Sequence, residues 1–160
     1  MISFPLAGGL FNHRAVGVCI VDGHVLLHRS VNDDFWSLPG GRVELGEASS
    51  QAIVREMREE LGLEAQTERL LWVVETFFTH GDVSHHELGM YYLISFPHDA
   101  PIYDKTHVHE GLEDIDLPLI FRWFPLETLP NVRLFPTFLH VGLRELPQYP
   151  AHVIHTDSDA

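Results

Sequence analysis

The sequence predicts an α/β protein in which helices pack on a mixed β-sheet. Segments that read as strands and helices follow each other in the order strands, helix, strands, helix, which favours a layered sandwich over a strictly alternating parallel fold. The 160 residues include 45% hydrophobic and 21% charged residues, enough to form a real core. We therefore expect one domain over residues 1–160, with an extended or frayed tail from about residue 147.

The first elements predicted are two antiparallel strands within residues 15–30. The run AVGVCIVDGHVLLHRS is rich in β-branched and aliphatic residues and is interrupted by Asp22-Gly23, a pair suited to a type I′ hairpin turn. A short strand at residues 36–38 and a Pro-Gly-Gly break follow.

A helix is expected from Ser49 to Leu61. Apolar residues recur along one arc, which we expect to face a sheet, and Gly62 suits the position just after the helix; the arc consists of Ile53, Val54, Met57 and Leu61.

The second half of the chain predicts another hairpin, a long loop, a strand and a helix. The runs RLLWVVETFF and ELGMYYLISF read as strands joined by a longer polar loop over residues 80–86. Residues 97–117 lack periodicity and read as a surface loop, LIFRWF at 119–124 as a strand. Residues 135–146 predict a C-terminal helix with Pro136 in its first turn.

Composition narrows the function classes. A net charge of −13 argues against binding a nucleic-acid polymer, which requires a basic surface. No apolar run is long enough to span a membrane, and the first residues do not resemble a secretory signal. The single cysteine, Cys19, cannot form an internal disulfide, so we expect a reducing, cytoplasmic location; it lies in an apolar strand and reads as a packing residue.

Three glutamates on the predicted helix point to a metal site. Glu56, Glu59 and Glu60 are spaced i, i+3 and i+4, so their carboxylates converge near the C-terminal end of the helix. Repulsion between like charges and the helix dipole both oppose this placement. A solvated acidic face is the simpler interpretation, but a bound Mg²⁺ would turn the repulsion into coordination and could carry substrate phosphates.

These glutamates belong to a stretch that resembles the Nudix box, G-x5-E-x7-R-E-U-x-E-E-x-G-U. Every fixed position is filled between Gly41 and Leu63, where the chain reads GRVELGEASSQAIVREMREELGL. The resemblance implies an α/β/α sandwich around a mixed sheet, with the box as a loop-helix-loop that holds Mg²⁺ or Mn²⁺. It also implies hydrolysis of a nucleoside diphosphate linked to another group X, by a metal-activated water.

By position in the box, the resemblance assigns a role to several residues. Glu56, Glu59 and Glu60 are expected to bind the metal, with help from the carbonyl of Gly40, and Glu47 to bind it through water. Arg55 is expected to orient the glutamates by ion pairing. The general base is open between Glu56 and two glutamates of the long loop, Glu110 and Glu113, with the isolated Glu87 as a further candidate.

Substrate-binding residues outside the box are predicted more loosely. Arg14 and Arg29 could bind phosphate and Trp36 could stack on a base, as could Phe35, Phe77 and Phe78, while Glu110 and Glu113 could reach the substrate from their loop. Solvated arginines and core aromatics are the alternatives. The loop histidines His80, His85, His86, His107 and His109 fit no familiar zinc spacing.

The substrate class stays open among nucleoside triphosphates, nucleotide sugars and ADP-ribose, because we find none of the family's subgroup motifs. The partner is then a small nucleotide, and a homodimer is the one protein partner we consider. Two other functions compete with hydrolysis: a nucleotide-binding module that does not cleave, and an interaction protein whose acidic helix only carries charge.

Overall fold

The computed structural model describes residues 1–112 and 118–158, and in these the strands form two sheets. The larger sheet has the order β1-β2-β7-β6-β10, with β5 paired to β2; its strands are β1 (Ser3–Leu6), β2 (Gly9–Val18), β5 (Gly40–Arg42), β6 (Gln66–His80), β7 (Val83–Ser95) and β10 (Ala151–Thr156). The smaller sheet has the order β3-β4-β9-β8; its strands are β3 (Ile20–Val21), β4 (His24–Ser30), β8 (His109–Glu110) and β9 (Leu119–Pro125).

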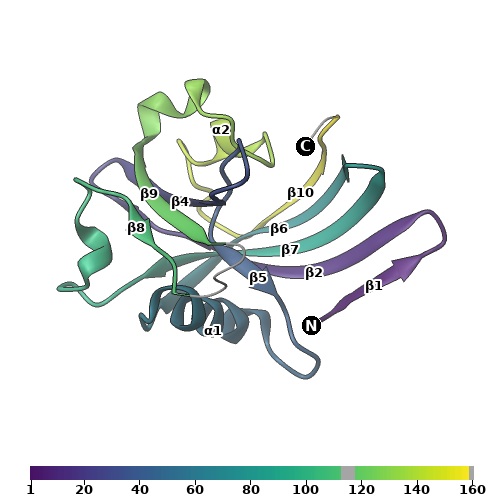
Figure 1. Cartoon of the computed structure of the whole chain (residues 1–160), viewed down its shortest axis with the longest axis horizontal. Helices are drawn as coiled ribbons and strands as arrows, with labels where there is room; N and C mark the ends of the chain where they lie inside the picture. The colour runs from purple at the N-terminus through teal and green to yellow at the C-terminus, as the bar shows by residue number, and fades with distance from the viewer. Residues whose placement is uncertain (113–117, 159–160) are drawn as a thin grey trace.

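The larger sheet is mixed, as predicted. β2 runs parallel to β7 and β10 runs parallel to β6, whereas its other pairs are antiparallel. The helix α1 (Ser49–Leu61) lies below the sheets in Figure 1, and the 3₁₀ helix η2 (Leu126–Asn131) and the short α2 (Leu139–Gly142) lie above them. The α/β class is therefore confirmed, although only α1 is a helix of substantial length.

Two hydrophobic cores lie on the two sides of the strands. Neighbouring residues of a strand point to opposite faces, so Ala15 joins the core with Ile53 and Met57 of α1 while Val16 joins the core with Leu129 and Leu139. This alternation fixes α1 against one face and the η2–α2 region against the other.

The first hairpin is confirmed but is shared between the two sheets. Asp22 and Gly23 connect β3 to β4 with φ values of 51° and 71°, the positive values that a type I′ turn requires. The strand before the turn is divided near Cys19, so that β2 pairs within the larger sheet and β3 within the smaller. The short strand predicted at 36–38 is wrong: Trp36 and Ser37 make only isolated bridges.

The second hairpin is longer than the sequence predicted. Its strands continue to His80 and from Val83, so Gly81 and Asp82 make the connection and the predicted loop at 80–86 is mostly strand. Backbone pairing joins His80 to Val83 and Thr79 to Ser84, so these residues form strands although their polar side chains had predicted a loop.

The C-terminal region differs most from expectation. The helix predicted over 135–146 is reduced to the four residues of α2, and the tail forms β10, which pairs with β6 from Ala151↔Trp72 to Thr156↔Phe77. The described part of the predicted 97–117 loop contains the 3₁₀ helix η1 (Pro101–Tyr103) and β8. Within residues 1–112 and 118–158, no helix is long and apolar enough to cross a membrane.

Candidate metal and substrate site

The carboxylate of Glu56 lies directly against the backbone at Gly41. A Cβ atom added at Gly41 would stand 2.1 Å from the carboxyl carbon of Glu56, so only glycine allows this approach. Gly40 is equally confined, because its Cβ would stand 2.2 Å from the carbonyl oxygen of Ala15. Gly41 thus lets β5 approach α1, and Gly40 lets it approach β2, which explains why β5 begins with two glycines in a row.

Arg55 links three of the predicted site glutamates. Its guanidinium donates to Glu47 at 2.8 Å and 3.1 Å, to Glu56 Oε1 at 2.8 Å and to Glu59 Oε2 at 3.0 Å. A further hydrogen bond reaches the carbonyl of Arg42 at 3.1 Å. One cation thus holds carboxylates from the loop and from two positions of the helix, and its role in orienting metal ligands stays a prediction.

The carboxylates held by Arg55 differ in their electrostatics. Hydrogen bonds from Arg55 hold the pKa of Glu47 below its usual range. Burial raises the pKa of Glu56, with Glu59 adding to the effect and Arg55 opposing it. Glu56 therefore resists being charged more than Glu47 does, and a nearby cation would relieve the cost of its ionisation.

Glu60 is the most buried of the three helix glutamates. It is 7% exposed, and its Oε2 lies 3.8 Å from Nδ1 of His28 on β4. Burial, with a smaller contribution from Arg14, lowers the pKa of His28 to about 3, so this imidazole is neutral near pH 7. The sequence had singled out Glu60 but not its histidine neighbour.

The oxygen atoms of these carboxylates and of the Gly40 carbonyl are chemically suited to bind a hard divalent cation. Carboxylate oxygens and a backbone carbonyl are the ligands that Mg²⁺ prefers, and Mg²⁺ keeps several waters, so it needs few protein ligands. The residues that would hold it are Glu56, Glu59, Glu60 and the carbonyl of Gly40. In the described parts of the chain, however, no three Asp, Glu, His or Cys side chains are already grouped around one metal position, and Glu56 and Glu59 are turned toward Arg55.

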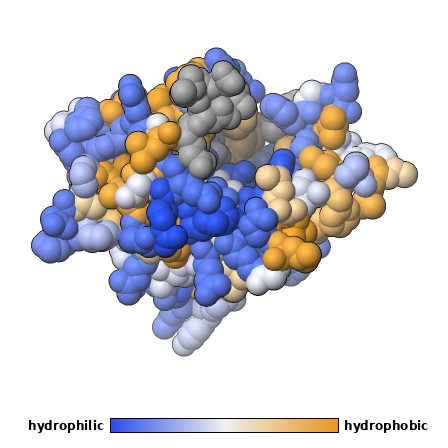
Figure 2. Space-filling model, turned by 60° about the horizontal axis from the view of Figure 1, so that its bottom comes forward, coloured by the Kyte–Doolittle hydropathy of each residue, from blue (hydrophilic) through white to orange (hydrophobic). Residues whose placement is uncertain are grey.

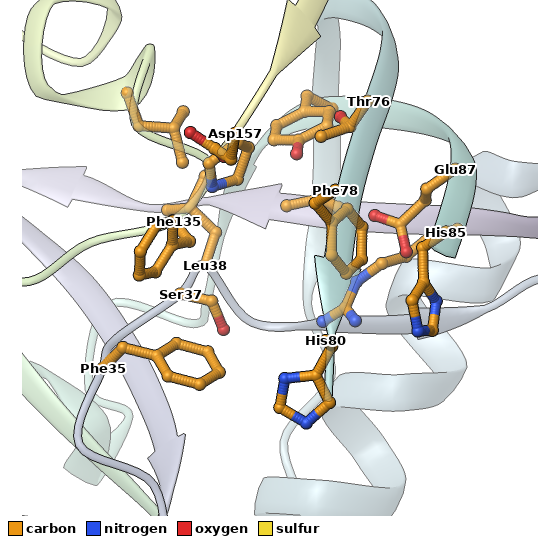
Figure 3. A pocket seen from close by; sticks show the side chains of 15 residues that line it. Phe35, Ser37, Leu38, Thr76, Phe78, His80, His85, Glu87, Phe135 and Asp157 are labelled. Carbon is orange, nitrogen blue, oxygen red and sulfur yellow. The ribbon is translucent and has the colours of Figure 1, made fainter. Parts of the chain in front are cut away.

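A pocket of about 250 Å³ lies between the strands β2, β7 and β6 on one side and residues 35–38 and 135–139 on the other. Figure 3 shows Phe35 and Phe135 on one side of it, Phe78, His85 and Glu87 on the other, and Thr76 and Asp157 beyond them; the remaining lining residues are Arg14, Val16, Ser37, Leu38, His80, Tyr91, Pro136 and Leu139. Its aromatic walls and few polar groups are typical of a small-molecule site.

Arg14 connects this pocket to the metal-site residues. It lines the pocket, and its NH2 group donates to the carbonyl of Gly40 at 3.1 Å. The predicted phosphate-binding residue is thus placed between the aromatic pocket and the glutamates of α1.

Seen from the α1 side of the molecule, hydrophilic residues cover the middle of the surface (Figure 2).

Arg29 and Trp36, two other predicted substrate residues, do not line the pocket. The guanidinium of Arg29 lies 5.0 Å from the centre of the Trp36 ring and donates to the carbonyl of Asp33 at 2.5 Å. Trp36 packs against Phe124, with ring centres 4.8 Å apart. The structure therefore places Trp36 at the edge of a hydrophobic core, the alternative that the sequence had left open.

Of the two loop glutamates proposed as general base, one is described by the structure and one is not. Glu110 is exposed on β8, beside Leu61 and Leu63, and no hydrogen bond or ion pair joins it to the described box residues. Glu113 lies outside the described residues. Glu87, in contrast, lies within β7 and lines the aromatic pocket, a position its isolated appearance in the sequence did not reveal.

Several pocket residues gave no signal in the sequence. Thr76 faces Glu87 across the β6–β7 pair, and Phe135 and Asp157 come from the C-terminal region that was expected to be a helix and a loose tail. Asp157 reaches the pocket because its backbone N–H donates to the carbonyl of Phe77 at 3.0 Å, directly after β10.

The histidines divide among several places. His80 and His85 line the pocket, and His86 packs on Phe77, with ring centres 4.6 Å apart. His107 and His109 lie together on the surface near Asp104. No three of the described histidines, cysteines and acids are arranged to hold a metal ion.

Comparison with known protein families gives one clear match. The model of the NUDIX domain matches residues 11–141, which include most of β2, the box, β6 and β7.

Curated relatives match mainly in shorter stretches. An ADP-ribose pyrophosphatase of Methanocaldococcus jannaschii is 41% identical over 70 residues, which cover 40% of this chain and 41% of the relative. A Bacillus subtilis protein described as an uncharacterised Nudix hydrolase, YvcI, is 27% identical over 120 residues, 75% of this chain and 70% of the relative. For two of the curated relatives, the match spans only 29% and 41% of the relative's own length.

Solved structures share the fold. The crystal structure of a UDP-X diphosphatase superposes with a TM-score of 0.58, covers 89% of this chain and 66% of its own, and is 18% identical. At this identity the likeness concerns the fold alone.

Proposed function

This chain belongs to the NUDIX domain family, and on that premise we propose that it hydrolyses the diphosphate linkage of a nucleoside diphosphate joined to another group X, with Mg²⁺ or Mn²⁺ as cofactor. Nucleoside triphosphates, nucleotide sugars and ADP-ribose are the substrate classes considered. The observation that carries the proposal is that Arg55 gathers Glu47, Glu56 and Glu59 beside Gly40, whose carbonyl also receives Arg14 from the aromatic pocket.

Each residue then has a task. A bound divalent cation would neutralise the diphosphate and lower the pKa of a water for attack on phosphorus. Arg55 keeps the carboxylates of Glu56 and Glu59 in place, and Gly41 leaves room for Glu56. Arg14 is placed to contact the phosphate nearest the pocket.

We assign the general base to Glu56. It lies at the junction of β5 and α1, next to the glycine carbonyl that the metal would share, whereas Glu110 lies on β8 beside Leu61 and Leu63. A base must come within hydrogen-bond reach of the attacking water, and of these two residues Glu56 has the nearer position. The buried Cys19 thiol fits a reducing, cytoplasmic setting for the reaction.

The test is a panel of nucleoside triphosphates, nucleotide sugars, ADP-ribose and RNA with a 5′-triphosphate, each incubated with the chain and Mg²⁺ or Mn²⁺. We expect metal-dependent release of phosphate-containing products, and product analysis identifies the bond cleaved. Thermal melts with and without Mg²⁺ provide a second readout, because a ligand at 100 times its Kd adds about 2.7 kcal/mol of stability. Absence of products together with unchanged melting would refute the proposal.

A nucleotide-binding module without turnover gives a different pattern in the same experiments. Nucleotides would raise the melting temperature, but no member of the panel would be cleaved with either metal. Such a result would replace hydrolysis with binding as the function of the site.

A further inference from the structure

Two groups in the lining of the aromatic pocket can only accept hydrogen bonds, and they limit which part of a nucleotide the pocket can hold. Two carboxylates, Glu87 and Asp157, lie among its lining residues together with the hydroxyl groups of Thr76 and Tyr91. Arg14 is the one lysine or arginine in the described lining. A phosphate would be repelled by the two carboxylates, so the pocket suits the uncharged end of the substrate.

The walls of the pocket suit a flat ring. Phe35 and Phe135 meet edge to face at 5.5 Å between ring centres, and Phe35 also approaches His80 at 6.5 Å. On the facing side, Phe78 is stacked on His85 at 4.6 Å with an angle of 4° between the rings. Figure 3 shows these rings around a common opening. The volume of about 250 Å³ is small for a binding pocket, and it limits the occupant to about one ring system.

The two carboxylates are not equally available. Asp157 already accepts hydrogen bonds from the Thr137 hydroxyl at 2.5 Å and from His155 Nε2 at 2.9 Å. For Glu87, no side chain or backbone group of residues 1–112 and 118–158 donates to its carboxylate. Its neighbour across the strands is Thr76, 4% exposed. Glu87 is therefore the acceptor left to the ligand.

Tyr91 adds a neutral hydroxyl that can both donate and accept a hydrogen bond. Tyr91 is 2% exposed, and its ring covers Gly89, where an added Cβ would stand 2.6 Å from the ring. Burial, and to a lesser degree the charge of Glu87, raises the pKa of the Tyr91 phenol, so the group stays a neutral hydroxyl.

We propose that this pocket selects the base of the substrate, and that Glu87 reads a base edge with two adjacent N–H donors, as guanine presents. A carboxylate only accepts hydrogen bonds, and its two oxygens can receive two parallel N–H groups. Guanine offers a ring N–H beside an exocyclic amino group. Uracil places carbonyl acceptors beside its ring N–H, and adenine places a ring acceptor beside its amino group. The inference rests on the proposed function and names the nucleoside it prefers.

The positions of Arg14 and Glu56 agree with a nucleotide whose base lies in the pocket. With the base between Phe78 and the Phe35–Phe135 pair, the phosphates would extend toward Arg14, which donates to the carbonyl of Gly40 at 3.1 Å. The diphosphate would then reach Glu56, whose carboxylate lies against Gly41.

The test compares kcat/KM for GTP, ITP, ATP and UTP with Mg²⁺. Inosine lacks the amino group of guanine, so ITP measures that one contact. We expect GTP to be preferred over ITP by roughly tenfold to a hundredfold, the range for a hydrogen bond to a charged group, and over ATP and UTP by at least as much. Equal values for the four nucleotides would overturn the proposal.

The variant Glu87→Gln assigns the effect to one residue. We expect it to raise KM for GTP and reduce the GTP-to-ITP ratio, while kcat changes less. Glu75→Gln is the matched control, because Glu75 precedes Thr76 on the same strand, pairs with His152 at 2.8 Å and does not line the pocket. An unchanged GTP-to-ITP ratio in Glu87→Gln would overturn the role of Glu87.

Metal-free calorimetry with GMP, IMP and UMP separates this inference from the proposed function. Binding of GMP in preference to IMP and UMP, lost in Glu87→Gln, supports the base pocket even if no nucleotide is hydrolysed. Hydrolysis without preference, with equal binding of the three monophosphates, supports the reaction and overturns the base pocket.

Discussion

The metal-site residues and the aromatic pocket are neighbours, but they are built in opposite ways. The first set comes from one continuous stretch, Gly40 to Glu60, in which a loop and a helix bring the carboxylates to Arg55. The second comes from six separate stretches of the chain, which lie on β2, β6 and β7, in the loop at 35–38 and at two places in the C-terminal region. If the proposed function holds, the difference teaches that the chemistry is encoded locally, whereas the choice of substrate depends on how distant segments pair.

The largest effect is expected from Glu59→Gln in the local site. Removing one charge from a metal-binding carboxylate should lower kcat by at least about a hundredfold. The side chain of Glu59 is 40% exposed, so the melting temperature should change little. Glu64→Gln is the control, since Glu64 pairs with Arg58 just beyond α1 and takes no part in the Arg55 cluster. Near-normal turnover in Glu59→Gln would remove this residue from the metal site.

Gly41→Ala tests the close approach of Glu56. The added Cβ would stand 2.1 Å from the carboxyl carbon, so the carboxylate must move by about an ångström, a displacement that can cost on the order of a hundredfold in rate. Gly142→Ala adds the same methyl group with its nearest described neighbour at 3.3 Å and is expected to keep its turnover. Steady-state kinetics on both variants make the comparison, and equal rates would show that Glu56 does not act from this position.

Two variants, Phe78→Leu and Trp36→Leu, test which aromatic residues belong to the pocket. Loss of a stacking ring at Phe78 should raise KM by roughly fivefold to a hundredfold. Trp36 packs on Phe124 outside the pocket, so its loss should lower the free energy of unfolding and affect KM less. If Trp36→Leu raised KM as much as Phe78→Leu, the original assignment of Trp36 to substrate binding would be restored.

The smallest effect is a pH dependence of the free energy of unfolding that comes from His28. Its folded-state pKa of about 3 lies below the unfolded value near 6.5, so the unfolded chain binds the extra proton and stability falls as pH decreases from 6.5 toward 3. At pH 5 the loss should reach about 2 kcal/mol relative to pH 7.5. Urea unfolding at the two pH values measures it, with His28→Phe as the comparison. A wild-type chain with the same pH dependence as the variant would contradict the buried neutral state of His28.

The sequence predicted best what depends on neighbours in the chain. The bounds of α1, the glycine after it and the turn at Asp22-Gly23 follow from local propensities, and the box positions of Glu47, Arg55 and Glu56 led to their shared contact. Their roles in catalysis stay predictions.

The pocket could not be predicted in the same way. Thr76 and Glu87 face each other only because of the register of β6 and β7, and Asp157 arrives only because β10 pairs with β6. Arg29 and Trp36 were chosen for their residue types, which suit a ligand and a core equally well. Whether such a residue lies in a ligand site or in the core depends on long-range strand pairing, which composition does not encode.

The position of β10 at the edge of the larger sheet has a consequence for protein engineering. This strand pairs with β6 and brings Asp157 to the pocket, and it lies far along the chain from α1. Within β10, Ala151 and Val153 pack against the core that includes Leu129 and Leu139, whereas Asp157 follows the strand and lines the pocket. Substitutions at position 157 would therefore change the pocket lining while leaving the pairing of β10 with β6 in place.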